Sequence, residues 1–157
     1  WRMSEVVIRR AGIDDLPALL SMAMRMYQTQ DIRRQGLHFH THSAESYLTH
    51  LVSSEFAILL MAVKDGRPVG MIAGVISPWM GEMSQLMLYH VLWWVEPERA
   101  GEWIGERLVK EFENWGRVNG VAFVVMGTRD FDGETAMIRW YRRLGYSHLQ
   151  HHFMKKV

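Results

Sequence analysis

A strand, helix, strand pattern limits the folds open to this chain. Residues 85–95 form a long run of aliphatic and aromatic residues, and residues 121–126 form a shorter, wholly apolar run. Between them, apolar residues recur at the spacing of an amphipathic helix: Ile104, Leu108, Phe112 and Trp115. Two strands joined by one helix form a parallel pair with a right-handed crossover. We therefore predict a sheet that contains a parallel pair.

The other segments place this pair in a mixed sheet. Residues 57–64 and 69–76 are β-prone, and the Asp65-Gly66 turn between them predicts a hairpin. The further expected elements are a strand over 6–10, a helix that begins at Asp14-Asp15-Leu16-Pro17, helices over 44–53 and 134–144, and one or two closing strands within 146–156. The predicted class is α/β, with a mixed, mostly antiparallel sheet around a central parallel pair.

Size and composition point to one folded domain. The chain has 157 residues, of which 48% are hydrophobic and 22% are charged, and this is close to average globular usage. We take residues 3–157 as a single domain and give Trp1 and Arg2 no functional weight, because Met3 is a candidate natural start. There is no apolar run of membrane-spanning length and no signal-peptide pattern, so we expect a cytoplasmic protein.

Charge and residue usage argue against several classes of partner. The net charge of +1 gives none of the basic excess that draws proteins to nucleic acid or to acidic membranes, so we expect neither partner. The chain has no cysteine, which excludes a disulfide and a thiolate nucleophile. His38, His40 and His42 alternate along a polar stretch and could chelate zinc or nickel. We favour solvated loop histidines and predict no metal, because no carboxylate or cysteine partner accompanies them.

The first strand of the parallel pair runs into the stretch VEPERAGEWIGERL, residues 95–108. A helix amino terminus presents unpaired N–H groups and partial positive charge, so this turn could hold a phosphate or pyrophosphate. The alternative is that Gly101 and Gly105 only permit a tight turn and close packing.

This stretch and a second one carry a family resemblance. Six residues match V-x-P-x-x-[RQ]-G-x-G-[IVA]-[GA] and the helix after it: Val95, Pro97, Gly101, Ile104, Gly105 and Leu108. Residues 136–146 resemble N-x-x-A-x-x-x-Y-x-x-x-G-[FY] at Tyr141, Leu144, Gly145 and Tyr146. These are motifs A and B of the GCN5-related N-acetyltransferase (GNAT) superfamily, which the chain resembles over nearly its whole length. The resemblance implies a GNAT-like sheet whose central parallel strands splay apart, with helices on both faces.

The resemblance also implies a function. Acetyl-CoA would be the co-substrate, and an acetyl group would move directly to a primary amine of a small molecule or peptide. Backbone groups of Trp93, Trp94 and Val95 would hold the pantetheine arm. Amides of the following turn would hold the pyrophosphate: Ala100, Gly101, Glu102, Trp103, Ile104 and Gly105. The alternative is a catalytically inactive GNAT-like binding module, and a homodimer is one expected state.

Two side chains are candidates for proton transfer. The resemblance makes Tyr141 the donor to the departing thiolate; the alternative is a core tyrosine at helical spacing. His90 is the group on the 85–95 strand that titrates near neutral pH, so it is the candidate base, although a packed histidine is the alternative. Strand alternation places His90 on the same face as Leu92 and Trp94.

The chain departs from motif A at two positions. Ala100 stands where the family has arginine or glutamine, and Trp103 stands in a slot that is normally glycine. The Trp103 ring either points out of the turn or fills the pyrophosphate space. Glu102 and Glu106 would oppose an anion, and the offsetting cations on this stretch are Arg99 and Arg107.

Aromatic residues outside the motifs suggest the acceptor. In this family, the segments that carry Tyr27, Phe39, the histidine stretch and Trp79 shape the acceptor pocket. Their aromatic character suggests an acceptor with an apolar part.

Overall fold

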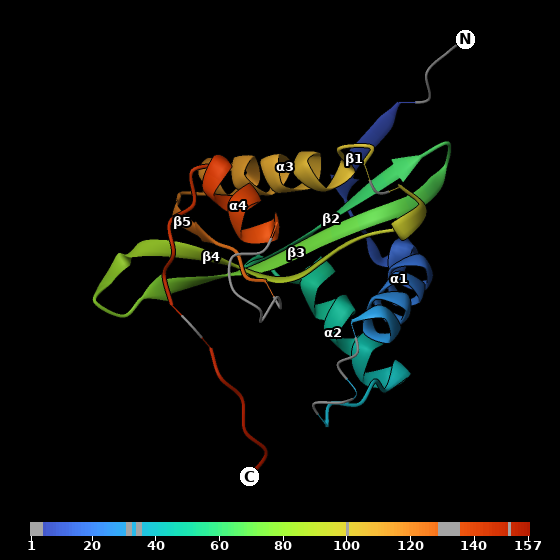
Figure 1. Ribbon diagram of the computed structural model, residues 1–157, viewed down its shortest axis with the longest axis horizontal. Coiled ribbons are helices and arrows are strands. Elements are labelled where there is room, and N and C mark those ends of the chain that lie inside the picture. Colours follow the sequence, from blue (N-terminus) through green and yellow to red (C-terminus); the bar gives the residue numbers. More distant parts are fainter. Residues whose placement is uncertain (1–4, 31–32, 34–35, 100, 129–135, 151) are drawn as a thin grey trace. The chain divides into compact units, whose positions relative to one another are not determined.

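The computed structural model describes residues 5–30, 33, 36–99, 101–128, 136–150 and 152–157 (Figure 1). The chain divides into two compact units, Trp1–Val125 and Met126–Val157. The single domain over residues 3–157 stays a prediction.

The first unit contains a mixed five-stranded sheet. Its strands are β1 (Val6–Arg10), β2 (Ala57–Lys64), β3 (Arg67–Trp79), β4 (Glu82–Val95) and β5 (Val121–Val125). They lie in the order β1-β2-β3-β4-β5, and all neighbours are antiparallel except β4 and β5, which are parallel. The predicted α/β class and the parallel pair are confirmed, and among the described strands the pair lies at one edge of the sheet, because β5 is the last strand.

The predicted hairpin joins β2 to β3. Asp65 and Gly66 both have positive φ, 50° and 72°, which is the backbone that a tight two-residue hairpin turn requires. Glycine adopts this conformation freely and aspartate tolerates it, so the local sequence fixes the turn.

Helices cover both faces of the sheet (Figure 1). The helices α1 (Leu16–Thr29) and α2 (Thr41–Ser53) lie on one face, and α3 (Ile104–Val118) lies on the other. The core under α1 and α2 includes Leu19, Met22, Leu48, Leu51, Met61, Met71, Leu92 and Trp94. On the α3 face, Phe112 is wholly buried against Gly74. The expected helical layers are therefore present.

The second unit contains α4 (Ala136–Arg143). The helix ends at Arg143; in the turn that follows, Gly145 has a φ of 91°, and the Tyr146 N–H donates to the Tyr141 carbonyl at 3.0 Å. The predicted closing strands are wrong for the described residues that follow. Leu149 and Phe153 are 63% and 94% exposed there, so they supply no buried strand face.

Candidate active site

The parallel pair ends well before β4 does. Its register runs from Leu86 opposite Val121 to Tyr89 opposite Val125, where β5 stops. β4 continues along β3 as far as Val95. The last part of β4 therefore extends past its parallel neighbour and leads into the turn before α3.

A bulge changes the face on which His90 lies. Gly74 pairs with His90 and Ala73 with Leu92, so Val91 is an extra residue on β4. Gly74 faces Phe112 of α3, whereas Leu92 belongs to the core under α1 and α2. Because cross-strand partners share a face, His90 lies on the α3 face. The prediction that it shares a face with Leu92 and Trp94 is wrong, since the bulge resets the alternation.

Trp93 and Trp94 point to opposite faces of β4. Trp94 is 8% exposed and packs in the core under α1 and α2. Trp93 lies beneath the start of α3, where a Cβ built on Gly105 would come 3.2 Å from its Cζ2 and 3.6 Å from Val95 Cγ2. Gly105 therefore allows α3 to begin close to β4, which agrees with the packing role considered for this glycine.

The turn between β4 and α3 contains two left-handed residues. After the short 3₁₀ helix η3 (Pro97–Arg99), Gly101 has φ 90° and Trp103 has φ 59°. Ala100 lies outside the described residues. A left-handed conformation costs about 1–2 kcal/mol for a residue with a Cβ, which accounts for glycine in the family pattern at the Trp103 position. The Trp103 side chain is 73% exposed, so its ring faces solvent instead of filling the turn.

The carboxylates of the turn are paired with cations. Glu102 accepts from Lys64 Nζ at 2.7 Å and from Arg99 Nη1 at 3.3 Å, and Glu106 pairs with Lys110 at 2.6 Å. The hydrogen bond from Lys64, with a smaller contribution from Arg99, lowers the pKa of Glu102. Arg99 thus offsets Glu102 as predicted.

The contacts of two cations, Lys64 and Arg107, differ from those expected from the sequence. Lys64 comes from the end of β2, 38 residues from Glu102 in sequence, and sequence reasoning missed it. Arg107 donates to the Val6 carbonyl at 2.8 Å. It therefore contacts β1 rather than either turn carboxylate.

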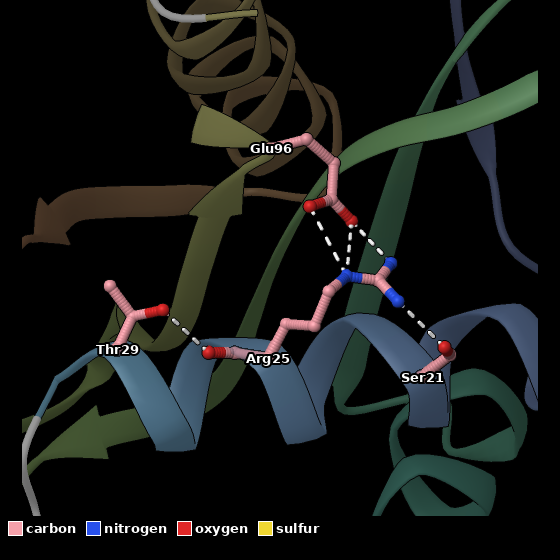
Figure 2. A network of polar contacts seen from close by, with 4 residues as sticks. All are labelled: Ser21, Arg25, Thr29 and Glu96. Atoms are coloured by element: carbon pink, nitrogen blue, oxygen red, sulfur yellow. Dashed lines mark hydrogen bonds and ion pairs between the residues drawn. The ribbon is translucent and has the colours of Figure 1, made fainter. Parts of the chain in front are cut away.

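Sequence reasoning also missed Glu96, the first residue after β4. It is 5% exposed and forms an ion pair with Arg25 of α1 (Figure 2). Arg25 Nε donates to Oε1 at 3.0 Å and to Oε2 at 3.2 Å, its Nη2 also donates to Oε1, and its Nη1 donates to Ser21 Oγ at 2.7 Å. The hydrogen bond to Glu96 raises the pKa of Arg25. The one sequence signal that could have identified Glu96 is its position directly after a predicted strand.

An open hollow of about 530 Å³ adjoins this ion pair. Its volume falls within the range of small-molecule sites, about 300–1,000 Å³. It is lined by Arg25, Gln28, Thr29, Pro68, Trp94, Glu96, Pro97 and Glu98. The hollow therefore combines apolar surface with charged groups at the point where β4 enters the turn.

Tyr141 belongs to the second unit, whereas His90 and the turn belong to the first. Its side chain is buried, and its hydroxyl donates to the Gly127 carbonyl at 2.8 Å. The ring centroids of Trp140 and Tyr146 each lie 5.5 Å from that of Tyr141. Tyr141 thus combines a packed ring with a hydroxyl on a backbone acceptor.

The candidate acceptor and metal residues lie apart from the turn in sequence. Tyr27 donates to the Leu37 carbonyl at 2.9 Å, and its ring lies 5.4 Å from that of Phe39. Trp79 is half exposed and folds over Gly81. Within the described part of the chain, no three histidine, aspartate or glutamate residues come together as a metal site, and no helix there is long and apolar enough to cross a membrane.

The chain is similar to known proteins in sequence and in structure. The model of the Acetyltransferase (GNAT) family matches residues 19–146. No curated protein matches. An aminoglycoside N-acetyltransferase in complex with CoA is similar in structure, with a TM-score of 0.80 and 14% identity over 99% of this chain and 97% of that one.

Two further crystal structures are similar. An aminoglycoside acetyltransferase from an uncultured soil metagenomic sample has a TM-score of 0.76 and 15% identity, covering 98% of this chain and 99% of that one. A ribosomal-protein-alanine N-acetyltransferase from Brucella melitensis biovar Abortus 2308 has a TM-score of 0.74 and 14% identity, with the same coverage. With the family match over most of its length, the chain belongs to the GNAT family of acetyltransferases.

Proposed function

We propose that the protein transfers an acetyl group from acetyl-CoA to a primary amine of a small molecule or peptide. The observation that carries this proposal is the β4–α3 turn. In this turn β4, which extends past the end of its parallel neighbour β5, leads into the amino terminus of α3. The turn lies within the residues that the GNAT family model matches. The names of the similar structures support an amine acceptor, since they are acetyltransferases of aminoglycosides and of a protein alanine.

The proposed chemistry is a direct transfer. Amides of residues 101 and 103–105 hold the pyrophosphate at the positive end of α3, and the backbone of residues 93–95 holds the pantetheine arm. The Glu102 amide, which was expected to share this role, instead donates to the Arg99 carbonyl at 3.2 Å. The neutral amine attacks the thioester carbonyl, so a C–N bond forms and the C–S bond breaks. Tyr141 supplies a proton to the thiolate, and His90 is the candidate that takes a proton from the amine.

An inactive binding module is the second candidate, favoured by Ala100 and Trp103 in motif A. Release of free CoA thiol, measured with acetyl-CoA and a panel of aminoglycosides, polyamines and peptides, separates the two. The enzyme releases CoA with at least one amine and produces an acceptor heavier by one acetyl group. Cofactor binding without either product would favour the module.

Replacing Trp103 with glycine is expected to stabilise the protein. It relieves about 1–2 kcal/mol of left-handed strain, against about 0.5–1 kcal/mol from the greater freedom of glycine in the unfolded chain. Thermal denaturation should show a small rise in Tm, whereas Trp103→Phe, which keeps the strained Cβ, should show none. A lower Tm for the glycine variant than for the phenylalanine variant would contradict this explanation.

Replacing Glu102 with glutamine is expected to tighten acetyl-CoA binding about threefold, because it removes a negative charge beside the proposed phosphates. It also releases Lys64 and Arg99 to face them. Calorimetry at low and high salt checks this, and the gain should shrink as salt screens the charges. Glu111→Gln, farther along α3, is the control and should change little. Weaker binding by Glu102→Gln would show that Glu102 supports the site instead of opposing the anion.

A further inference from the structure

Glu96 stands at the junction of strand and turn. Its N–H donates to the Val69 carbonyl at 2.9 Å, which extends the β3–β4 pairing beyond Val95. Its carbonyl accepts from the Arg99 N–H at 2.8 Å, which closes the 3₁₀ helix η3. The direction in which the chain leaves the sheet is therefore set at Glu96.

The Glu96 side chain is bound by Arg25 of α1, which lies 71 residues earlier in the sequence. A carboxylate that is 5% exposed loses most of its hydration, so it needs a partner. Arg25 provides a planar guanidinium, of which two nitrogens contact Glu96 while the third contacts Ser21 (Figure 2). Residues Leu19 and Met22 of the same helix are wholly buried in the core, so the guanidinium extends from a fixed support.

Stability alone is a weak reason for such a pair. The desolvation of two charges offsets much of their attraction. Replacing a buried ion pair with apolar residues of similar volume therefore often leaves a protein equally stable. What the pair adds is geometry, because the forked guanidinium restricts both the place and the orientation of the carboxylate.

We propose that Arg25 is a positioning residue for the β4–α3 turn: by fixing Glu96 it sets the path of η3 (Pro97–Arg99) and thereby the direction of the amides that hold the pyrophosphate. This inference rests on the proposed function. Arg25 would not contact the reacting atoms, so its loss should weaken cofactor binding and leave the chemical step largely intact.

A matched control exists on the same side of the fold. Arg9 forms two 2.8 Å hydrogen bonds to Asp15 and lowers the pKa of that carboxyl to about 2. The side chains of Arg9 and Arg25 are equally exposed, at 46%. Arg9 links β1 to the 3₁₀ helix η1 (Ile13–Asp15), and within the described residues it forms no hydrogen bond or ion pair with the β4–α3 turn. Arg9→Met and Arg25→Met therefore each remove one arginine ion pair, but only Arg25→Met removes a contact to the residue at which the turn begins.

The test is steady-state kinetics with acetyl-CoA and with S-acetylpantetheine, which lacks the pyrophosphate. Arg25→Met should raise the KM for acetyl-CoA about tenfold with kcat within about twofold of wild type, as expected for lost uniform binding. Its KM for S-acetylpantetheine should stay at the wild-type value. Arg9→Met should lower Tm but leave both KM values unchanged.

Arg25→Lys keeps the charge without the fork and should raise the KM for acetyl-CoA by about threefold. This variant decides the matter if Arg25→Met fails to fold. An unchanged KM in the folded Arg25 variants, or an equal rise in Arg9→Met, would overturn the positioning role while wild-type turnover upholds the proposed function. A wild-type protein that uses neither donor would instead overturn the proposed function, and the positioning role with it.

Discussion

Replacing Tyr141 with phenylalanine is expected to lower kcat about 100-fold, the lower end of the range for loss of a general acid. The thiolate of CoA would then leave without the proton that the hydroxyl supplies. The KM for acetyl-CoA should change little, because the ring remains packed beside Trp140 and Tyr146. The buried hydrogen bond to Gly127 is also lost, at a cost of about 1 kcal/mol, so kinetics should be measured well below the Tm.

Tyr146→Phe is the matched control for this variant. The Tyr146 ring lies 5.5 Å from the Tyr141 ring, and the substitution likewise removes a tyrosine hydroxyl from the second unit. We expect its kcat to stay within about threefold of wild type, since it is assigned no proton transfer. Full turnover by Tyr141→Phe, or equal losses in the two variants, would remove Tyr141 from the mechanism.

Replacing Gly74 with alanine is expected to lower the free energy of unfolding by about 3 kcal/mol, the upper end of the usual cost of overpacking. A Cβ at this position would lie 2.4 Å from Phe112 Cζ and 2.7 Å from the Tyr89 carbonyl oxygen. Phe112 is wholly buried and the other contact is backbone, so neither group can move aside cheaply. The strain falls on the bulge beside His90, and we therefore expect turnover to fall as well.

Chemical denaturation measures this cost. Gly12→Ala is the control, because a Cβ there meets nothing closer than Asp15 Oδ2 at 4.0 Å and its φ of −116° suits any residue. It should change the free energy of unfolding by no more than about 0.5 kcal/mol. Similar values for the two alanine variants would show that the sheet and α3 adjust more readily than the contacts imply.

Local pattern was enough to predict much of the fold. The apolar strands on either side of an amphipathic helix predicted the parallel pair, and Asp65-Gly66 predicted the β2–β3 turn. The Trp103 position was also visible, since the family pattern has glycine there and the structure gives a left-handed backbone. These features depend on residues close together in sequence.

The features that sequence reasoning missed depend on tertiary contacts. Lys64 reaches Glu102, and Arg25 reaches Glu96, from elements that no motif connects. The face of His90 was predicted wrongly because alternation assumes an unbroken strand, whereas β4 carries an extra residue. The spacing of apolar residues in the sequence does not reveal such a bulge.

Titration of acetyl-CoA into the protein by calorimetry tests the central claim most directly, because the β4–α3 turn is assigned to this cofactor. One molecule should bind each chain, with a Kd between about 1 μM and 1 mM, the usual range for substrates. Binding should weaken in Arg25→Met and tighten in Glu102→Gln. An absence of saturable heat at several millimolar acetyl-CoA, on the order of the upper limit of that range, would contradict the acetyltransferase account.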